Sequence, residues 1–189
     1  MSGLTKRMLA QSLTKLLYQE PLSGITVQQI ADDCGVNRQT FYYHFQDIYA
    51  LLEWIFEEDA RQLLGGDVTY ASWKEKFLRI FRHLQEYRIP ARNIYHSVSR
   101  AQLVRYLRTM VTPVVREVAE DIVEKNHMTI LPEDLDLVAA LYEWSFVGIA
   151  LDWLDGLIDQ SYEKHLDKAM TVIDGSMEHA LQKLAQPKP

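Results

Sequence analysis

The sequence predicts an all-α protein: an N-terminal three-helix helix-turn-helix domain and a C-terminal helical bundle, about nine helices in all. Two observations support this fold class. Apolar residues recur at three- and four-residue spacing along almost the whole chain, as in Leu9, Leu13 and Leu16, which is typical of amphipathic helices. Proline and glycine then divide the pattern into helix-sized pieces. No repeat or glycine-rich phosphate loop interrupts it.

Composition narrows the class of protein. With 48% hydrophobic and 24% charged residues in 189, the chain has the profile of a globular protein with a sizeable core. The run from 137 to 151 is too short for a membrane span, which needs about 20 apolar residues. The N-terminus lacks the pattern of a secretory signal, and the single Cys34 excludes an internal disulfide and a thiolate zinc site. We expect a cytoplasmic protein that uses no metal, cofactor or membrane.

Charge is distributed unevenly along the chain. The net charge is −6. Residues 74–126 carry 11 Lys or Arg against six Asp or Glu, and residues 133–178 carry two against 11. An acidic total argues against coating nucleic acid, but it leaves room for a local contact by one end of the molecule.

The first 46 residues contain the start and stop signals of three helices. A helix from about 3 to 19 ends before Pro21. Thr26 and Gln29 have the spacing of a capping box, which opens a short helix to about residue 33. Gly35 suits a tight left-handed turn, and Asn37 can cap a further helix over 38–45. Two short helices joined by a glycine turn form a helix-turn-helix, so we expect a helix-turn-helix domain over 1–46.

The remaining residues, 47–189, are predicted to form a second helical domain. Asp47 can cap a helix to about residue 64, and Pro90 and Pro113 are expected to break or kink later helices. The further helices are expected over about 71–87, 99–126, 132–156 and 162–184.

The helix at 38–45 presents hydrogen-bond donors. Phe41 and Phe45 lie one turn apart and are expected to point inward. The side chains left outward are Arg38, Gln39, Thr40, Tyr42, Tyr43 and His44.

These donors suit a DNA groove. The second helix of such a motif presents its first residues to base edges in the major groove, where Arg38 could pair with guanine and Gln39 with adenine. The others suit phosphate or thymine-methyl contacts, and the amides after Thr26 offer a second phosphate site. Periodicity alone fits the half-buried aromatics of an ordinary helical bundle equally well.

The stretch "ITVQQIADDCGVNRQTFYYHFQD", which starts at Ile25, resembles the helix-turn-helix of the TetR family of bacterial regulators. Its extension "QTFYYHFQDIYALLEWIFEED" is similar to regulators associated with dihydroxyacetone kinase operons. The resemblance implies that Thr40, Tyr42 and His44 contact the DNA backbone. It also implies that Arg38, Gln39 and Tyr43 tune the operator sequence.

One position departs from the family pattern. Many members carry a lysine for phosphate where this chain has Ile48, which implies weaker binding with a shallower dependence on salt. The N-terminal Lys6 and Arg7 could compensate, although an exposed terminus explains them equally well.

The family resemblance also implies that the C-terminal domain, 47–189, dimerises and receives a signal. The helix over 132–156 is apolar on every side, which predicts contact with a second chain. We therefore expect a homodimer through the last two predicted helices. The apolar stripe expected on the last helix comprises Leu166, Ala169, Met170, Ile173, Met177, Ala180, Leu181 and Leu184.

Glu143 is the one charge in the apolar run from 137 to 151. Because a buried lone carboxylate is costly, it should be paired. Two explanations stay open. We favour a structural ion pair or dimer-rim carboxylate; the other is a ligand contact or a counterion to Arg92, His96 or Arg100. The candidate ligand-binding residues are Arg92, His96, Arg100, Glu143 and Trp144.

Taken together, the sequence predicts a homodimeric transcription regulator on a palindromic double-stranded DNA operator. The family's commoner role favours a repressor controlled by a small molecule; the alternative is an activator controlled by a protein partner. A helical enzyme using Glu143 with His96 is disfavoured, because the sequence has no nucleophile elbow, metal signature or closely spaced acid pair. A helical adaptor that does not bind DNA is the remaining alternative.

Overall fold

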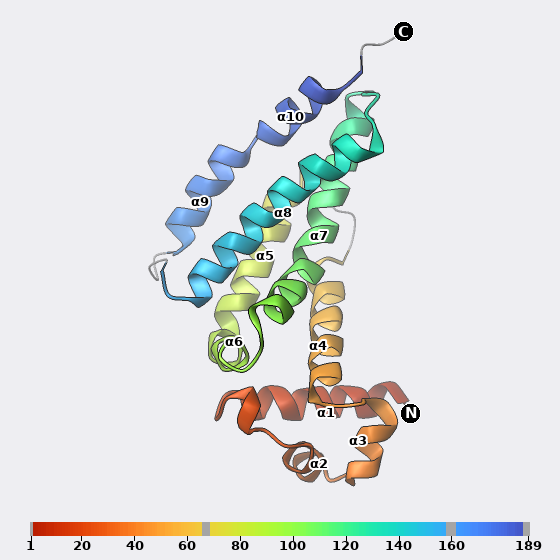
Figure 1. Cartoon of the computed structure of the whole chain (residues 1–189), viewed down its shortest axis with the longest axis vertical. Coiled ribbons are helices and arrows are strands. Elements are labelled where there is room, and N and C mark those ends of the chain that lie inside the picture. Colours follow the sequence, from red (N-terminus) through yellow and green to blue (C-terminus); the bar gives the residue numbers. More distant parts are fainter. Residues whose placement is uncertain (1, 66–68, 158–161, 187–189) are drawn as a thin grey trace. The chain divides into compact units, whose positions relative to one another are not determined.

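The computed structural model describes residues 2–65, 69–157 and 162–186, and all regular structure in these ranges is helical. The predicted all-α class is therefore confirmed (Figure 1). The elements are α1 (Ser2–Leu17), a 3-10 turn (Leu22–Gly24), α2 (Val27–Cys34), α3 (Arg38–His44), α4 (Ile48–Leu63), α5 (Trp73–Glu86), α6 (Arg88–Tyr95), α7 (Arg100–Lys125), α8 (Pro132–Leu154), α9 (Tyr162–Ile173) and α10 (Ser176–Leu184).

The chain forms two compact units. Unit 1 contains residues 1–62 and 82–106, and unit 2 contains residues 63–81 and 107–189. The first unit therefore adds α4, α6 and the start of α7 to the predicted helix-turn-helix segment. The functional boundary after residue 46 stays a prediction, because helices can pack together without sharing a function.

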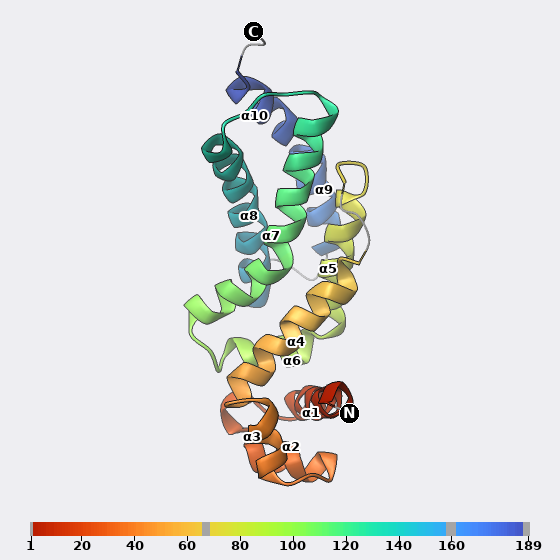
Figure 2. The ribbon, with the colours of Figure 1, turned by 90° about the vertical axis from the view of Figure 1, so that its right-hand side faces the viewer.

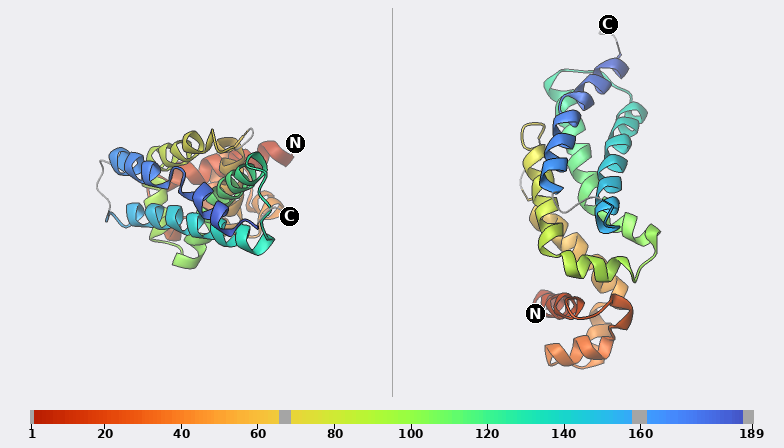
Figure 3. Two further views of the ribbon diagram at one scale, coloured as in Figure 1. Left: turned by 90° about the horizontal axis from the view of Figure 1, so that it is seen from above. Right: turned by 90° about the vertical axis from the view of Figure 1, so that its left-hand side faces the viewer.

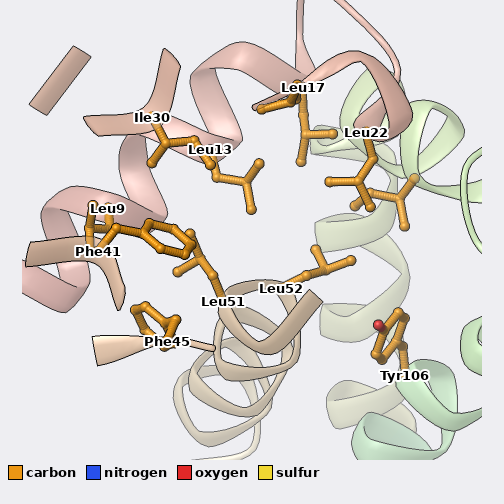
Figure 4. Packing of buried hydrophobic residues seen from close by; sticks show 12 residues of the cluster. Leu9, Leu13, Leu17, Leu22, Ile30, Phe41, Phe45, Leu51, Leu52 and Tyr106 are labelled. Carbon is orange, nitrogen blue, oxygen red and sulfur yellow. The ribbon is translucent and has the colours of Figure 1, made fainter. Parts of the chain in front are cut away.

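The core of unit 1 is built from the apolar stripes of its helices. Leu9, Leu13 and Leu17 of α1 are at most 2% exposed, and Phe41 of α3 is fully buried against them (Figure 4). Ile94 of α6 belongs to the same cluster. Within this unit α1 lies between α6 and the α2–α3 pair (Figures 1 and 2). One shared core thus fixes the position of α3.

Local signals form the helix-turn-helix as predicted. Thr26 Oγ1 accepts a hydrogen bond from the Gln29 amide at 3.2 Å, and Gln29 Oε1 accepts one from the Thr26 amide at 2.8 Å. Gly35 has φ 67°, a left-handed conformation that favours glycine. Asn37 Oδ1 accepts from the Thr40 amide at 2.8 Å and caps α3. These contacts fix both ends of the turn between α2 and α3.

Unit 2 is a bundle in which α10 packs beside α8 (Figure 3). Its centre contains Phe77 of α5 and Phe146 of α8, whose rings stack with centroids 3.7 Å apart. Trp73 meets both rings edge-on. These aromatic residues therefore belong to the packed core.

The expectations for the later helices have different outcomes. A helix break lies just before Pro90, since α5 ends at Glu86 and α6 begins at Arg88, and Pro90 lies in the first turn of α6, where a missing amide donor costs nothing. Pro113 lies inside α7 and does not divide it. The predicted helix over 162–184 is two helices, because Gly175 adopts φ 75° and separates α9 from α10.

Helix α8 is long and apolar enough, by length and composition, to cross a membrane. The apolar run of 15 residues, 137–151, covers only part of this helix, which has 23 residues. This is weak evidence for a membrane, because a core helix passes the same test. Phe146, Val147 and Ala150 on one face of α8 are buried.

Candidate functional site

Helix α3 exposes the side chains that the sequence predicted for DNA contact. Phe41 is fully buried and Phe45, at the C-cap, is 6% exposed, so both aromatic anchors point inward as expected. On the outer face Tyr43 is 83% exposed and Tyr42 is 49% exposed. The helix therefore presents phenol and other donor groups to solvent from a rigidly packed base.

Arg38 and Tyr42 contact each other along this face. Arg38 Nη2 lies 3.4 Å from the Tyr42 hydroxyl, and the guanidinium stands 5.9 Å from the Tyr42 ring. The contact spans one helical turn and both side chains are exposed. A base or phosphate can therefore replace this weak interaction without disturbing the core.

The hydroxyl groups of the two threonines predicted to contact DNA already donate hydrogen bonds within the chain. The Thr40 hydroxyl donates to Asn37 Oδ1 at 3.0 Å, and the Thr26 hydroxyl donates to Gln29 Oε1 at 2.7 Å. Both threonines stabilise helix N-termini and must exchange these bonds before donating to phosphate. His44 is half-buried, and its ring meets Tyr43 edge-on at 4.9 Å.

A shallow open groove lies between α2 and α3. Arg38 and Gln39 line it together with Gln28, Asp32 and Asn37, which the sequence analysis did not select as contacts. Gln28 Nε2 donates to Asp32 Oδ1 at 2.7 Å. The exposed i, i+4 spacing of Gln28 and Asp32 on α2 was the available signal. Asp32 places a negative charge beside the predicted reading residues, which opposes contact with phosphate and favours donors such as cytosine N4.

The two lysines of α1 both have partners inside unit 1. Lys15 of α1 forms an ion pair with Asp33 of α2. Hydrogen bonds from Lys15 and then Ser12 hold the pKa of Asp33 below its ordinary value. The Lys6 ammonium lies 5.4 Å from the centre of the Phe45 ring. Lys6 therefore contacts an aromatic residue of the core, whereas Arg7 is exposed.

The second candidate site was centred on Glu143. Its carboxylate is buried, accepts a hydrogen bond from Thr112 Oγ1 at 2.6 Å and lies 2.5 Å from Arg108 Nε. The charge partner of Glu143 is therefore Arg108 of α7, whereas the candidates from the sequence were Arg92, His96 and Arg100. Trp144 is 52% exposed, and the Arg108 guanidinium stands 5.6 Å from its ring.

This arrangement has the geometry of a structural ion pair. Breaking it would leave Glu143 uncompensated in a largely apolar setting. A ligand role for Arg92, His96, Arg100, Glu143 and Trp144 stays a prediction. Within the described ranges, no three His, Cys, Asp or Glu side chains are grouped closely enough to hold a metal ion.

Comparisons with protein families match both parts of the chain. The family described as "Bacterial regulatory proteins, tetR family" matches residues 12–55. The family described as "Transcriptional regulator C-terminal region" matches residues 71–175, which is more than half of the 189 residues. The first match contains the capped α2, the Gly35 turn and all of α3.

Individual relatives agree with this result. The HTH-type dhaKLM operon transcriptional activator DhaS of Lactococcus lactis subsp. lactis (strain IL1403) is 32% identical over 94 residues. That alignment covers 50% of each chain, so the chain matches about half the length of this curated relative.

Solved structures share the fold. A structure of "Dihydroxyacetone kinase operon activator DhaS" has a TM-score of 0.71 and 21% identity over 96% of this chain and 98% of that one. RolR in complex with resorcinol has a TM-score of 0.60 and 18% identity over 100% and 96%. At these identities the structures show the fold alone. These family matches lead to one conclusion: the chain belongs to the TetR family of bacterial transcriptional regulators.

Proposed function

We propose that the protein is a homodimeric activator that binds a palindromic DNA operator through α3. The observation that carries the DNA-binding role is the outer face of α3, where exposed donors stand on a helix that Phe41 anchors in the core. In a helix-turn-helix such a face enters the major groove. Arg38 and Gln39 then read base edges, while Thr40, Tyr42, Tyr43 and His44 contact the backbone or thymine methyl groups.

Selection of bound duplexes from a random library tests this role. The enriched sequence should be a palindrome, and affinity for it should fall steeply with salt, because phosphate contacts release counterions. Tyr42→Ala should lose this binding. Tyr18→Ala is the matched control: Tyr18 is 45% exposed, close to the 49% of Tyr42, and follows the end of α1. Equal losses in both variants, or no enriched sequence, would contradict the assignment.

The dimer is proposed to form through the outer face of α8, with α10 beside it. Leu137, Leu141 and Trp144 are 54%, 61% and 52% exposed and lie on one stripe at i, i+4 and i+7. The opposite face of α8 is buried in its own bundle. An apolar stripe on one side of a buried helix fits a copy of the same helix about a two-fold axis.

Most of the apolar residues expected on the last helix already pack inside the chain. Met170, Met177 and Leu181 are buried, and Leu184 is 37% exposed. The α8 stripe therefore supplies most of the proposed interface. Light scattering at micromolar concentration should give twice the chain mass of 22.0 kDa, and a monomer would end this part of the proposal.

The sign of regulation is proposed from the relatives. The sequence favoured a repressor as the commoner family role, but the Lactococcus lactis relative is named a transcriptional activator. Activation of a dihydroxyacetone kinase operon is therefore the specific form that we propose for this chain. A reporter placed behind its selected operator and the adjoining promoter should lose expression when the regulator is removed. Increased expression would establish a repressor instead.

A further inference from the structure

The segment of unit 1 between residues 82 and 105 is strongly basic in an acidic chain. It carries five arginines against the single carboxylate of Glu86, while the whole chain has a net charge of −6. Arg88 and Arg92 lie one turn apart on the exposed side of α6. Together with Tyr87 and Ile89 they form what we call the α6 surface.

The two arginines lack an internal counter-charge. Among the described residues, neither Arg88 nor Arg92 has an ion pair or a side-chain hydrogen bond. Arg108 and Arg116, by contrast, each contact a carboxylate. Like charges one turn apart repel on a helix, so an external anion that contacts both arginines would relieve this repulsion.

Apolar side chains lie beside these charges. Ile89 is 53% exposed and Tyr87, at the N-cap of α6, is 38% exposed. Tyrosine and arginine are enriched at protein interfaces, and the exposed Ile89 adds an apolar area that a partner could cover. A free phosphate or a simple polyanion would use the arginines but not Ile89, so the mixture favours a protein partner.

The position of α6 in unit 1 argues against DNA as that partner. Helix α1 lies between α6 and the α2–α3 pair (Figures 1 and 2). Pro90 and Ile94 form the buried side of α6, and Asn93 Nδ2 donates to the Leu17 carbonyl at the end of α1 at 2.7 Å. A duplex in contact with α3 would therefore face the opposite side of unit 1 from the α6 surface.

We propose that the α6 surface docks an acidic segment of a partner protein, with carboxylates meeting Arg88 and Arg92 and an apolar side chain covering Ile89. The proposal goes beyond DNA binding, since the surface and its charges belong to α6 alone. Asn93 and Ile94 attach α6 directly to α1 and its core. A docked partner therefore contacts the same compact unit that carries the reading helix.

Two synthetic helical peptides test the proposal on the full chain. The first carries two glutamates one turn apart beside a leucine, and the second has glutamine at both positions. Fluorescence anisotropy at low salt should detect binding of the glutamate peptide and much weaker binding of the glutamine peptide. The double variant Arg88→Gln/Arg92→Gln should lower affinity for the glutamate peptide by about tenfold or more, and Ile89→Ser by severalfold.

Matched controls remove an exposed arginine elsewhere. Arg61→Gln and Arg116→Gln each delete one positive charge that already has a carboxylate partner, and they should change affinity by less than about twofold. Circular dichroism checks that each variant folds. Equal binding of both peptides, or equal losses in the control variants, would overturn the proposal because binding would then not require the α6 surface.

Duplex binding separates this proposal from the proposed function. Arg88→Gln/Arg92→Gln should leave operator affinity within about twofold. If the double variant lowers affinity for the duplex as much as affinity for the glutamate peptide, the α6 surface is a DNA contact and the docking proposal fails. If the unmodified chain binds no operator but still discriminates the peptides, the DNA-binding function fails and the docking proposal stands.

Discussion

The exposed faces of α3 and α8 are chemical opposites. The α3 face consists of phenol, amide, imidazole, hydroxyl and guanidinium groups, which water can satisfy when no partner is bound. The α8 face exposes Leu137, Leu141 and Trp144. Removing these apolar side chains from water, by covering them with another apolar surface, is favourable. The two proposed contacts should therefore respond to different variables: DNA binding to salt and donor groups, and dimerisation to apolar area.

The largest effect is expected from a charge in the α8 stripe. Leu141→Asp should abolish the dimer, because it would bury a carboxylate in an apolar interface. Operator affinity should then fall by orders of magnitude, since one half-site contact is lost. Val172→Asp is the control, because Val172 of α9 is 78% exposed outside the stripe. Sedimentation that shows a dimer for Leu141→Asp would exclude this interface.

Two variants of α3 sharpen the reading model. Arg38→Ala should change base preference at one operator position and cost about 1 to 3 kcal/mol if Arg38 pairs with guanine. Tyr42→Phe should weaken all duplexes alike, because a phosphate contact carries no sequence information. Binding measured against a set of single-base operator variants distinguishes these patterns. An unchanged preference in Arg38→Ala removes Arg38 from the base-reading residues.

A smaller effect is expected from two tyrosine hydroxyls, one with and one without a hydrogen-bond partner. The Tyr106 hydroxyl in unit 1 is buried without a hydrogen-bond partner among the described residues, and burial raises its pKa. Tyr106→Phe should therefore stabilise unit 1 by about 1 kcal/mol. In unit 2 the Tyr70 hydroxyl accepts from the Gly175 amide at 3.0 Å, so Tyr70→Phe should destabilise by a similar amount. The free energy of unfolding in urea should rise for Tyr106→Phe and fall for Tyr70→Phe. A change in the same direction for both variants would contradict this prediction.

The smallest effect concerns acid. Hydrogen bonds from Lys15 and Ser12 lower the pKa of Asp33 in unit 1. Burial opposes the same change at Asp121 in unit 2, but hydrogen bonds from Lys125 and the Tyr70 amide lower its pKa. Stability from depressed carboxyl pKa values is present above the unfolded value of about 3.9 and is lost as pH falls through the folded value.

The urea concentration at half unfolding, measured between neutral pH and pH 3, should therefore decrease once the pH is below about 4. Asp33→Asn and Asp121→Asn should each have a lower midpoint at neutral pH and a smaller loss in acid. An acid limb unchanged by both substitutions would show that other carboxylates control it.

The two regions also differ in how far the sequence predicted them. In the helix-turn-helix the signals are local: the Thr26 capping box, the left-handed Gly35 and the Asn37 cap each act within four residues, and all three are confirmed. Phe41 and Phe45 point inward for the same reason. Backbone geometry and side-chain spacing were sufficient there.

Tertiary contacts determine what the sequence could not predict. The Arg108 partner of Glu143 comes from another helix, 35 residues away in sequence, so helical spacing could not identify it. Gly175 divides α9 from α10, and its amide donates to the hydroxyl of Tyr70, while the Ser176 hydroxyl donates to the Ile173 carbonyl. The spacing of apolar residues could not predict these contacts. The open groove of α2 and α3 likewise added Gln28 and Asp32 to the candidate interface.

The most direct test of a dimeric DNA reader is the stoichiometry of its complex. Native mass spectrometry would compare the selected palindrome with a duplex that retains one half-site, for the unmodified chain and for Leu141→Asp. We expect two chains on the palindrome, much weaker binding to the half-site, and single chains for Leu141→Asp. One unmodified chain per palindrome, with equal affinity for the half-site, would contradict the proposed homodimer.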